Sequence, residues 1–125
     1  MEKVQKMAYI CAPYRGETEE DVKANIRRAQ QYARIAHDRG WYPVVPHFFT
    51  EGLWGYDTKG DEVDREIIAF NLNLLRSCDV LIKCGATTSR GMAYELDWCR
   101  KNGKPILFHE DWKDLTGGCL ISPLL

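Results

Sequence analysis

The segment Val80-Leu-Ile-Lys-Cys-Gly-Ala-Thr-Thr-Ser-Arg-Gly-Met-Ala-Tyr-Glu95 runs from a short apolar stretch into the expected start of a helix. An apolar run followed by a capping serine predicts a buried strand that leads directly into a helix. In parallel α/β proteins this turn collects anionic ligands, because free backbone N–H groups point outward from the helix start. Ser89 and Gly91 therefore predict an anion cradle, although helix capping alone would also favour the serine. Glu95, less than two turns further on, is expected to face the same crevice as a catalytic carboxylate.

Strand-like and helix-like patterns alternate along the rest of the chain. Short apolar runs predict strands at residues 8–12, 42–46, 79–83 and 104–108, and helical periodicity predicts helices at 18–40, 61–77 and 90–102. The aromatic-rich stretch 47–59 is expected to be a loop that acts as a lid or as an interface. This alternation predicts one domain over residues 1–125. Its expected fold is a three-layer flavodoxin/Rossmann-like α/β sandwich, with a parallel sheet in the order 2-1-3-4.

With that strand order, the crevice lies where the first and third strands end. The loop after the first strand then supplies the candidate binding residues Ala12, Pro13, Arg15 and Gly16. Arg15 could grip a phosphate with its guanidinium or could pair with a nearby glutamate in solvent. Tyr9 is either a core aromatic, which sequence favours, or a hydroxyl aimed at the reacting centre. His47 could contact a base or a leaving group, although a lone histidine is more often structural.

Composition narrows the classes of partner. The net charge of −1 gives no basic excess, so no nucleic acid polymer is expected. No apolar run is long enough to span a bilayer, and the first residues lack a signal-peptide core, so we expect a cytoplasmic protein. Five cysteines without a Cys-x-x-Cys pair, and scattered histidines, argue against a disulfide framework or a metal site. We expect no metal and no cofactor.

Three segments resemble the nucleoside 2-deoxyribosyltransferase superfamily, and within it the branch that includes the 2'-deoxynucleoside 5'-phosphate N-hydrolases. They are Tyr9-Ile-Cys-Ala-Pro-Tyr-Arg-Gly16, Val44-Val-Pro-His47 and Ser89-x-Gly-x-x-Tyr-Glu95, of which the third is the most specific. The resemblance implies an enzyme that cleaves or exchanges an N-glycosidic bond in a small-molecule nucleoside or nucleotide. Glu95 would attack the anomeric carbon, and Tyr9 would support it. Ser89 and Arg15 would hold a 5'-phosphate.

The aromatic loop and the apolar C-terminus predict a homodimer or a higher homo-oligomer, because a single domain gives these apolar segments little to pack against. The resemblance implies a dimer in which Ser122 of a second copy reaches the phosphate. One residue departs from the superfamily pattern: Asn71 stands where an aspartate usually protonates the leaving base. An amide can donate a hydrogen bond but cannot deliver a proton. Three explanations are open: Asp64 substitutes as the acid, the leaving group needs none, or the protein binds nucleotides with little or no turnover. A structural or interaction role is a further alternative.

Overall fold

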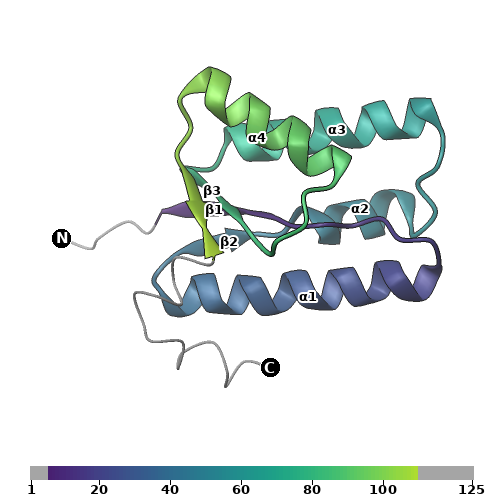
Figure 1. The fold of residues 1–125 in the computed structure, drawn as a ribbon, viewed down its shortest axis with the longest axis horizontal. Coiled ribbons are helices and arrows are strands. Elements are labelled where there is room, and N and C mark those ends of the chain that lie inside the picture. Colours follow the sequence, from purple (N-terminus) through teal and green to yellow (C-terminus); the bar gives the residue numbers. More distant parts are fainter. Residues whose placement is uncertain (1–5, 110–125) are drawn as a thin grey trace.

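A four-stranded parallel sheet forms the middle layer of the protein in this computed structural model, which describes residues 6–109 (Figure 1). Its strands are β1 (Met7–Cys11), β2 (Tyr42–Val44), β3 (Val80–Lys83) and β4 (Ile106–Phe108), in the spatial order β2-β1-β3-β4. The predicted α/β architecture and strand order are therefore confirmed, with strand ends shifted by one or two residues. Pro43 lies in the edge strand β2, where a missing N–H removes no ladder hydrogen bond on the open side.

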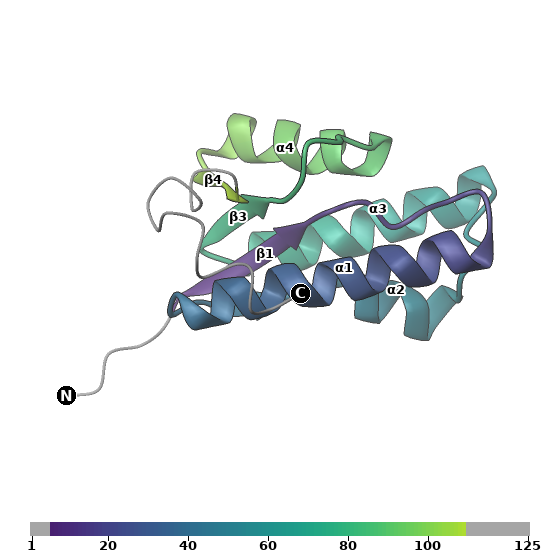
Figure 2. The same cartoon turned by 60° about the horizontal axis from the view of Figure 1, so that its bottom comes forward.

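Helices cover both faces of the sheet. Figures 1 and 2 show α1 on one face, and α3 and α4 on the other. The helices are α1 (Glu19–Asp38), α2 (Pro46–Trp54), α3 (Asp61–Arg76) and α4 (Arg90–Asn102). None of the helices within residues 6–109 combines the length and the apolar composition needed to cross a membrane.

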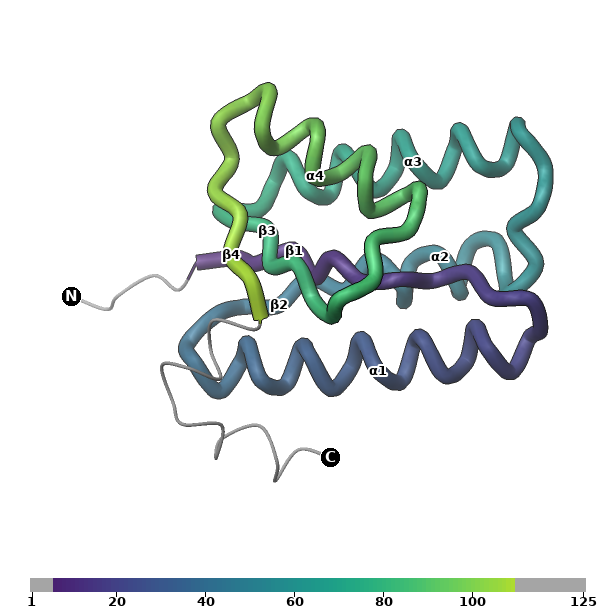
Figure 3. The backbone as a smooth tube through the Cα atoms, in the orientation of Figure 1, coloured from purple at the N-terminus to yellow at the C-terminus, as the bar shows by residue number. Residues whose placement is uncertain are grey.

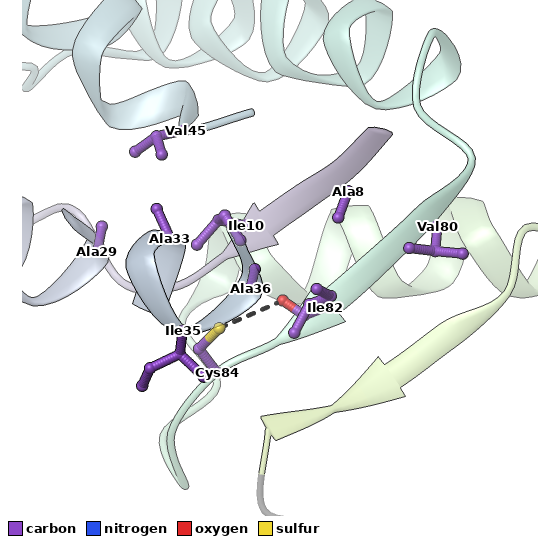
Figure 4. Packing of buried hydrophobic residues seen from close by; sticks show 10 residues of the cluster. All are labelled: Ala8, Ile10, Ala29, Ala33, Ile35, Ala36, Val45, Val80, Ile82 and Cys84. Carbon is purple, nitrogen blue, oxygen red and sulfur yellow. Dashed lines mark hydrogen bonds between the residues drawn. The ribbon is translucent and has the colours of Figure 1, made fainter. Parts of the chain in front are cut away.

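The alternation of side chains along β1 divides the core into two clusters, because successive residues of a strand point to opposite faces. Ala8 and Ile10 pack with Ala33 and other small residues of α1, as Figure 4 shows. Tyr9 and Cys11 point to the other face. There they pack with residues of α3, α4 and β3, which include Leu75, Leu81, Met92, Leu96 and Cys99. The first strand therefore sends its tyrosine and its cysteine together toward α4.

The ends of the helices follow from local chemistry. Thr18 caps α1 by accepting a hydrogen bond from the Asp21 backbone N–H, and the Asp21 carboxylate accepts one from the Thr18 N–H, both at 3.1 Å. Ser89 caps α4 in the same way, with Oγ accepting from the Met92 N–H at 3.3 Å. Gly103 ends α4 in the left-handed conformation, at φ +70°.

The prediction that residues 47–59 form a loop was wrong for most of its length, because residues 46–54 form the helix α2. Pro46 starts this helix at a position where its fixed φ is favourable and its missing N–H costs nothing. The buried side chains of Pro46, His47 and Thr50 share one face, while Phe48 and Leu53 are exposed. The aromatic residues concealed this helical pattern, since they occupy the outer face. The backbone tube in Figure 3 shows α2 lying beside α1 and α3, which it contacts.

Candidate active site

A cavity of about 220 Å³ lies at the carboxyl edge of the sheet, where the strand order predicted a crevice. Its wall comes from the loop after β1, from α2 and α3, and from the first turns of α4. Of the predicted site residues, the cavity wall contains Ala12, Arg15, His47, Asp64, Asn71, Ser89, Gly91 and Glu95. Tyr9, Pro13 and Gly16 do not line it. Ser122 lies outside the described residues.

Glu95 is a buried carboxylate on this wall, with 8% of its surface exposed. Met92, Leu96 and Cys99 form the apolar stripe that seats α4 on the sheet, and Glu95 lies beside this stripe. The Tyr9 hydroxyl donates a hydrogen bond to Oε2 at 2.5 Å, and the Cys11 thiol donates one to Oε1 at 3.3 Å. Tyr9 therefore belongs both to the core and to the site. The bond from Cys11 was not predicted, because a cysteine in an apolar strand is usually a small buried hydrophobe.

Burial dominates the ionisation of this group. Removal from water raises the pKa of Glu95 to about 7, although the hydrogen bonds from Tyr9 and Cys11 act to lower it. Burial, and then the charge of Glu95, raise the pKa of Tyr9 well above its ordinary value, and the same two causes raise the pKa of Cys11. Both neighbours therefore stay protonated and remain donors, while Glu95 itself ionises near neutral pH.

Two arginines of the same cavity wall share one carboxylate. Asp64 of α3 receives Arg15 Nη2 on Oδ1 at 2.7 Å and Arg90 Nη1 on Oδ2 at 2.6 Å. Arg15 is held further by Thr58, with Nε to the hydroxyl at 2.8 Å and Nη2 to the carbonyl at 3.0 Å. The three charged groups leave a net charge of +1 beside the N-terminus of α4. An anion is favoured at this point.

This pairing bears on the interpretations of two residues. Arg15 pairs with Asp64 and not with the glutamates that follow it in sequence. Burial acts to raise the pKa of Asp64, but the hydrogen bonds from Arg90 and Arg15 outweigh it and hold that pKa below its ordinary value. A carboxyl group that is ionised so readily is a poor proton donor at neutral pH, so the structure argues against Asp64 as a substitute acid. Arg90 was missed, although its place directly after the capping Ser89 was the available signal.

His47 holds the loop that follows β1. Its Nε2 lies 2.9 Å from the carbonyl oxygen of Pro13, a geometry that suits donation from the neutral ring. Burial lowers the pKa of His47 below its ordinary value, so the ring stays neutral at pH 7. Asn25 of α1 supports the same loop by donating to the carbonyls of Tyr14 and Arg15 at 3.0 and 3.1 Å. The geometry therefore favours the structural interpretation of His47.

The two glycines of the predicted site differ in their surroundings. A Cβ on Gly91 would meet no atom within 4 Å, so open space lies before the first turn of α4. A Cβ on Gly16 would lie 2.2 Å from the Cβ of Asp21, so close packing on α1 requires this glycine. The loop before Ser89 is held by buried Lys83, whose Nζ donates to the carbonyls of Gly85 and Thr87 at 2.5 and 3.1 Å.

Asn71 of α3 lines the cavity with an amide whose buried Oδ1 has no hydrogen-bond partner. Buried polar atoms are usually hydrogen-bonded, and within residues 6–109 the structure provides no partner for this oxygen. An unpaired amide oxygen at a cavity wall fits a position that is completed by a ligand or by water. Within the same residues, no group of three or more His, Cys, Asp or Glu side chains is arranged to hold a metal ion.

Comparisons with known proteins give a family for the chain and two similar proteins. The model of a family described as a domain of unknown function, DUF7768, matches residues 6–109. A Thermofilum pendens protein provisionally named 2'-deoxynucleoside 5'-phosphate N-hydrolase 1 is 26% identical over 99 residues, which are 79% of this chain. The match spans 64% of that relative, less than two-thirds of its length.

Among solved structures, a 2-deoxyribosyltransferase from Bacillus psychrosaccharolyticus shares the fold. Its TM-score is 0.60 at 16% identity, over 82% of this chain and 70% of that one. The predicted resemblance to the nucleoside 2-deoxyribosyltransferase superfamily is thus confirmed by a relative in sequence and by a relative in structure.

Proposed function

The chain belongs to the DUF7768 family, and we propose that it is an enzyme that cleaves or exchanges the N-glycosidic bond of a (deoxy)nucleoside or its 5'-monophosphate. One observation carries this proposal. A buried carboxylate, Glu95, and a cationic pair, Arg15 and Arg90, lie on the wall of one cavity at the switch point of the sheet. The names of the two relatives support the same class of reaction.

Glu95 is the nucleophile in this proposal. One of its oxygens bonds to the anomeric carbon while the bond from that carbon to the base nitrogen breaks, and the electron pair of the broken bond leaves with the base. The product is a glycosyl ester of Glu95, as in retaining glycosidases. Water then releases the sugar in a hydrolase, whereas a second base takes it in a transferase. Because attack needs the ionised carboxylate, the rate should rise with pH through about 7.

The anionic end of the substrate is assigned to the other side of the cavity. Ser89, the free N–H groups at the start of α4, Arg15 and Arg90 supply donors for a 5'-phosphate. Asp64 keeps both guanidinium groups in place, because each of its carboxylate oxygens pairs with one of the two arginines. Phosphate at this end and the nucleophile at the other would place the sugar between them.

Asn71 gives reason for a second candidate function, a nucleotide-binding or sensing module with little or no turnover. Its amide can donate a hydrogen bond to a departing base but cannot protonate it, and Asp64 is already committed to two arginines. In the enzyme, the departing base would therefore take its proton from water.

The two functions are separated by one experiment. The protein is incubated with each deoxynucleoside 5'-monophosphate and with the matching ribonucleotides, and free base is measured by chromatography. Base release that is abolished in Glu95→Gln supports the enzyme. Thermal stabilisation by a nucleotide without base release supports the binding module. Addition of a second base tests for transfer, since a new nucleoside appears only if the ester survives long enough to meet that base.

We also propose that the protein forms a homo-oligomer through the outer face of α2. Phe48, Phe49 and Leu53 are 45%, 43% and 61% exposed, and they extend an aromatic cluster in which Phe49 and Trp54 contact Phe70 of α3. A run of large apolar side chains on one exposed face favours contact with another surface. The inner faces of α2 and α3 line the cavity, so a second copy on their outer faces would brace the site.

A further inference from the structure

The two oxygens of Glu95 are held unequally. Tyr9 donates a short hydrogen bond, 2.5 Å, to Oε2, whereas Oε1 receives only the thiol of Cys11 at 3.3 Å. A phenol is a strong donor and a thiol is a weak one. More of the carboxylate's charge therefore stays available on Oε1 than on Oε2.

The sheet makes this arrangement possible. Tyr9 and Cys11 are two residues apart on β1, so their side chains project from the same face of the sheet toward α4. Both are completely buried. Neither bond therefore competes with bulk water, and each donor is fixed by the core packing around it.

We infer that Cys11 is a positioning residue for Glu95. Its thiol holds Oε1 in place but, as a weak donor, leaves most of the negative charge on that oxygen, so Oε1 is the oxygen that attacks the sugar. Oε2 stays anchored to Tyr9 throughout. This inference deepens the proposed function and rests on it. In the step, a bond forms between Oε1 and the anomeric carbon, the bond to the base nitrogen breaks, and its electron pair leaves with the base, which is protonated by water.

The chemistry of the intermediate explains why a thiol suits this position. When Glu95 becomes an ester it loses its negative charge and becomes a weaker acceptor. A buried hydroxyl that loses its hydrogen-bond partner is destabilising, whereas a buried thiol behaves as a small hydrophobe. Cys11 can therefore support the ionised carboxylate without penalising the ester that follows.

Other titratable groups near Glu95 set the background for a pH measurement. Cys99 lies on the same helix, and the charge of Glu95 contributes to its raised pKa after burial. The remaining groups lie on the cavity wall: Tyr14, Arg15, His47, Asp64 and Arg90. Cys11 differs from all of these groups because it donates a hydrogen bond directly to the Glu95 carboxylate. Removal of the thiol should therefore change the titration of Glu95 directly rather than through another group.

The test uses two variants that remove the donor. Cys11→Ala leaves a small void, and Cys11→Val keeps the space filled, so a shared effect cannot come from packing alone. Cys84→Ala is the matched control, because Cys84 is a buried cysteine in the other core cluster. The titration of Glu95 is followed by carbon-13 NMR of its carboxyl group in the free protein, with Glu95→Gln to assign the signal. The pH dependence of kcat/KM is measured with the nucleotide that is cleaved best.

We expect both Cys11 variants to raise the midpoint of the Glu95 titration by about half a pH unit to one pH unit, since a lost hydrogen bond to the charged form favours the neutral form. The acidic limb of kcat/KM should move by the same amount, while the plateau rate at high pH stays within about threefold of wild type. Cys84→Ala should change neither.

An unshifted NMR titration in both variants would overturn the inference while leaving the proposed function intact. A tenfold loss of plateau rate without any shift would also overturn it, because Cys11 would then act only through packing. If wild type releases no base from any nucleotide while the NMR shift is present, the proposed function fails. In that case the proposed attack by Oε1 is overturned as well, and only the hydrogen bond from Cys11 to Glu95 remains supported.

Discussion

The carboxylate of Glu95 is buried, whereas on a solvent-facing side of its helix it would be hydrated. Burial raises its pKa to about 7 from the ordinary 4.5, which corresponds to about 3 kcal/mol at ~1.36 kcal/mol per unit. The sign follows from linkage. The contribution of Glu95 to stability is fully present below pH 4.5 and is lost as pH rises through about 7. The unliganded protein thus carries a destabilising charge at the pH where the proposed attack needs that charge.

Glu95→Gln should therefore stabilise the protein while abolishing base release. The amide keeps the shape of the side chain but carries no charge, so we expect the free energy of unfolding to rise by about 1–3 kcal/mol at pH 8. The gain should be small at pH 5, where Glu95 is already neutral. Urea unfolding at the two pH values measures the difference, and Glu66→Gln, on an exposed face of α3, is the control. An equal gain at both pH values would contradict the assignment.

Asn71→Asp should restore a proton donor to the cavity wall. If chemistry limits turnover and the departing base lacks an acid, the substitution should raise the rate of base release by a factor of about 10²–10⁴. Activity should then fall at high pH as the new acid ionises. Steady-state base release between pH 5 and 9 measures both effects. Asn73→Asp on the exposed side of α3 provides the control, and an unchanged rate in Asn71→Asp would show that protonation is not what limits the reaction.

Among the elements, α3 and α4 together form the proposed anion site, which neither could form alone. Asp64 comes from the first turn of α3, and Arg90 is the first residue of α4. Arg90→Gln removes one charge-assisted partner, and we expect binding of a deoxynucleoside 5'-monophosphate to weaken about 10- to 100-fold.

The Arg90→Gln substitution should weaken only the contribution of the phosphate group to binding. Binding of the corresponding nucleoside, measured by the same titration calorimetry, should be nearly unaffected. Arg100→Gln, in the last turn of α4, removes a charge of the same kind far along the helix and should leave both affinities unchanged. A similar loss for the nucleoside would place Arg90 outside the phosphate site.

Elements with an apolar stripe on the buried face were predictable, and the one with aromatic residues on its outer face was not. Strands β1 and β3 and helices α1, α3 and α4 appear within one or two residues of their predicted bounds, because each has a clear apolar pattern, and in α1 and α4 a capping residue marks the start as well. Helix α2 was not predicted because Phe48 and Phe49, two of the aromatic residues that suggested a loop, lie outside the core. Its buried face includes His47 and Thr50, which carry little apolar signal.

At the scale of the whole molecule, strand order predicted where the candidate site lies. It did not predict which side chains of the site are hydrogen-bonded or ion-paired to one another. A switch point between β1 and β3 can be deduced from alternating elements, and it placed Ser89 and Arg15 at one edge. The Arg15–Asp64–Arg90 network and the bond from Cys11 to Glu95 join residues 26 to 84 positions apart. Such pairs depend on how helices pack on the sheet, and no local pattern encodes that packing.

The last prediction concerns the exposed aromatic face of α2. If a second copy covers it, then Phe48→Glu and Leu53→Glu each place a charge inside the interface, where an unpaired charge is costly. We expect either change to lower the molecular mass measured by light scattering to that of one chain at micromolar concentration, while circular dichroism shows an intact fold. Tyr42→Glu, at an exposed residue of β2, should not change the mass. A wild-type protein with the mass of one chain would contradict the proposed oligomer, whereas loss of base release in the single-chain variants would show that the site depends on the second copy.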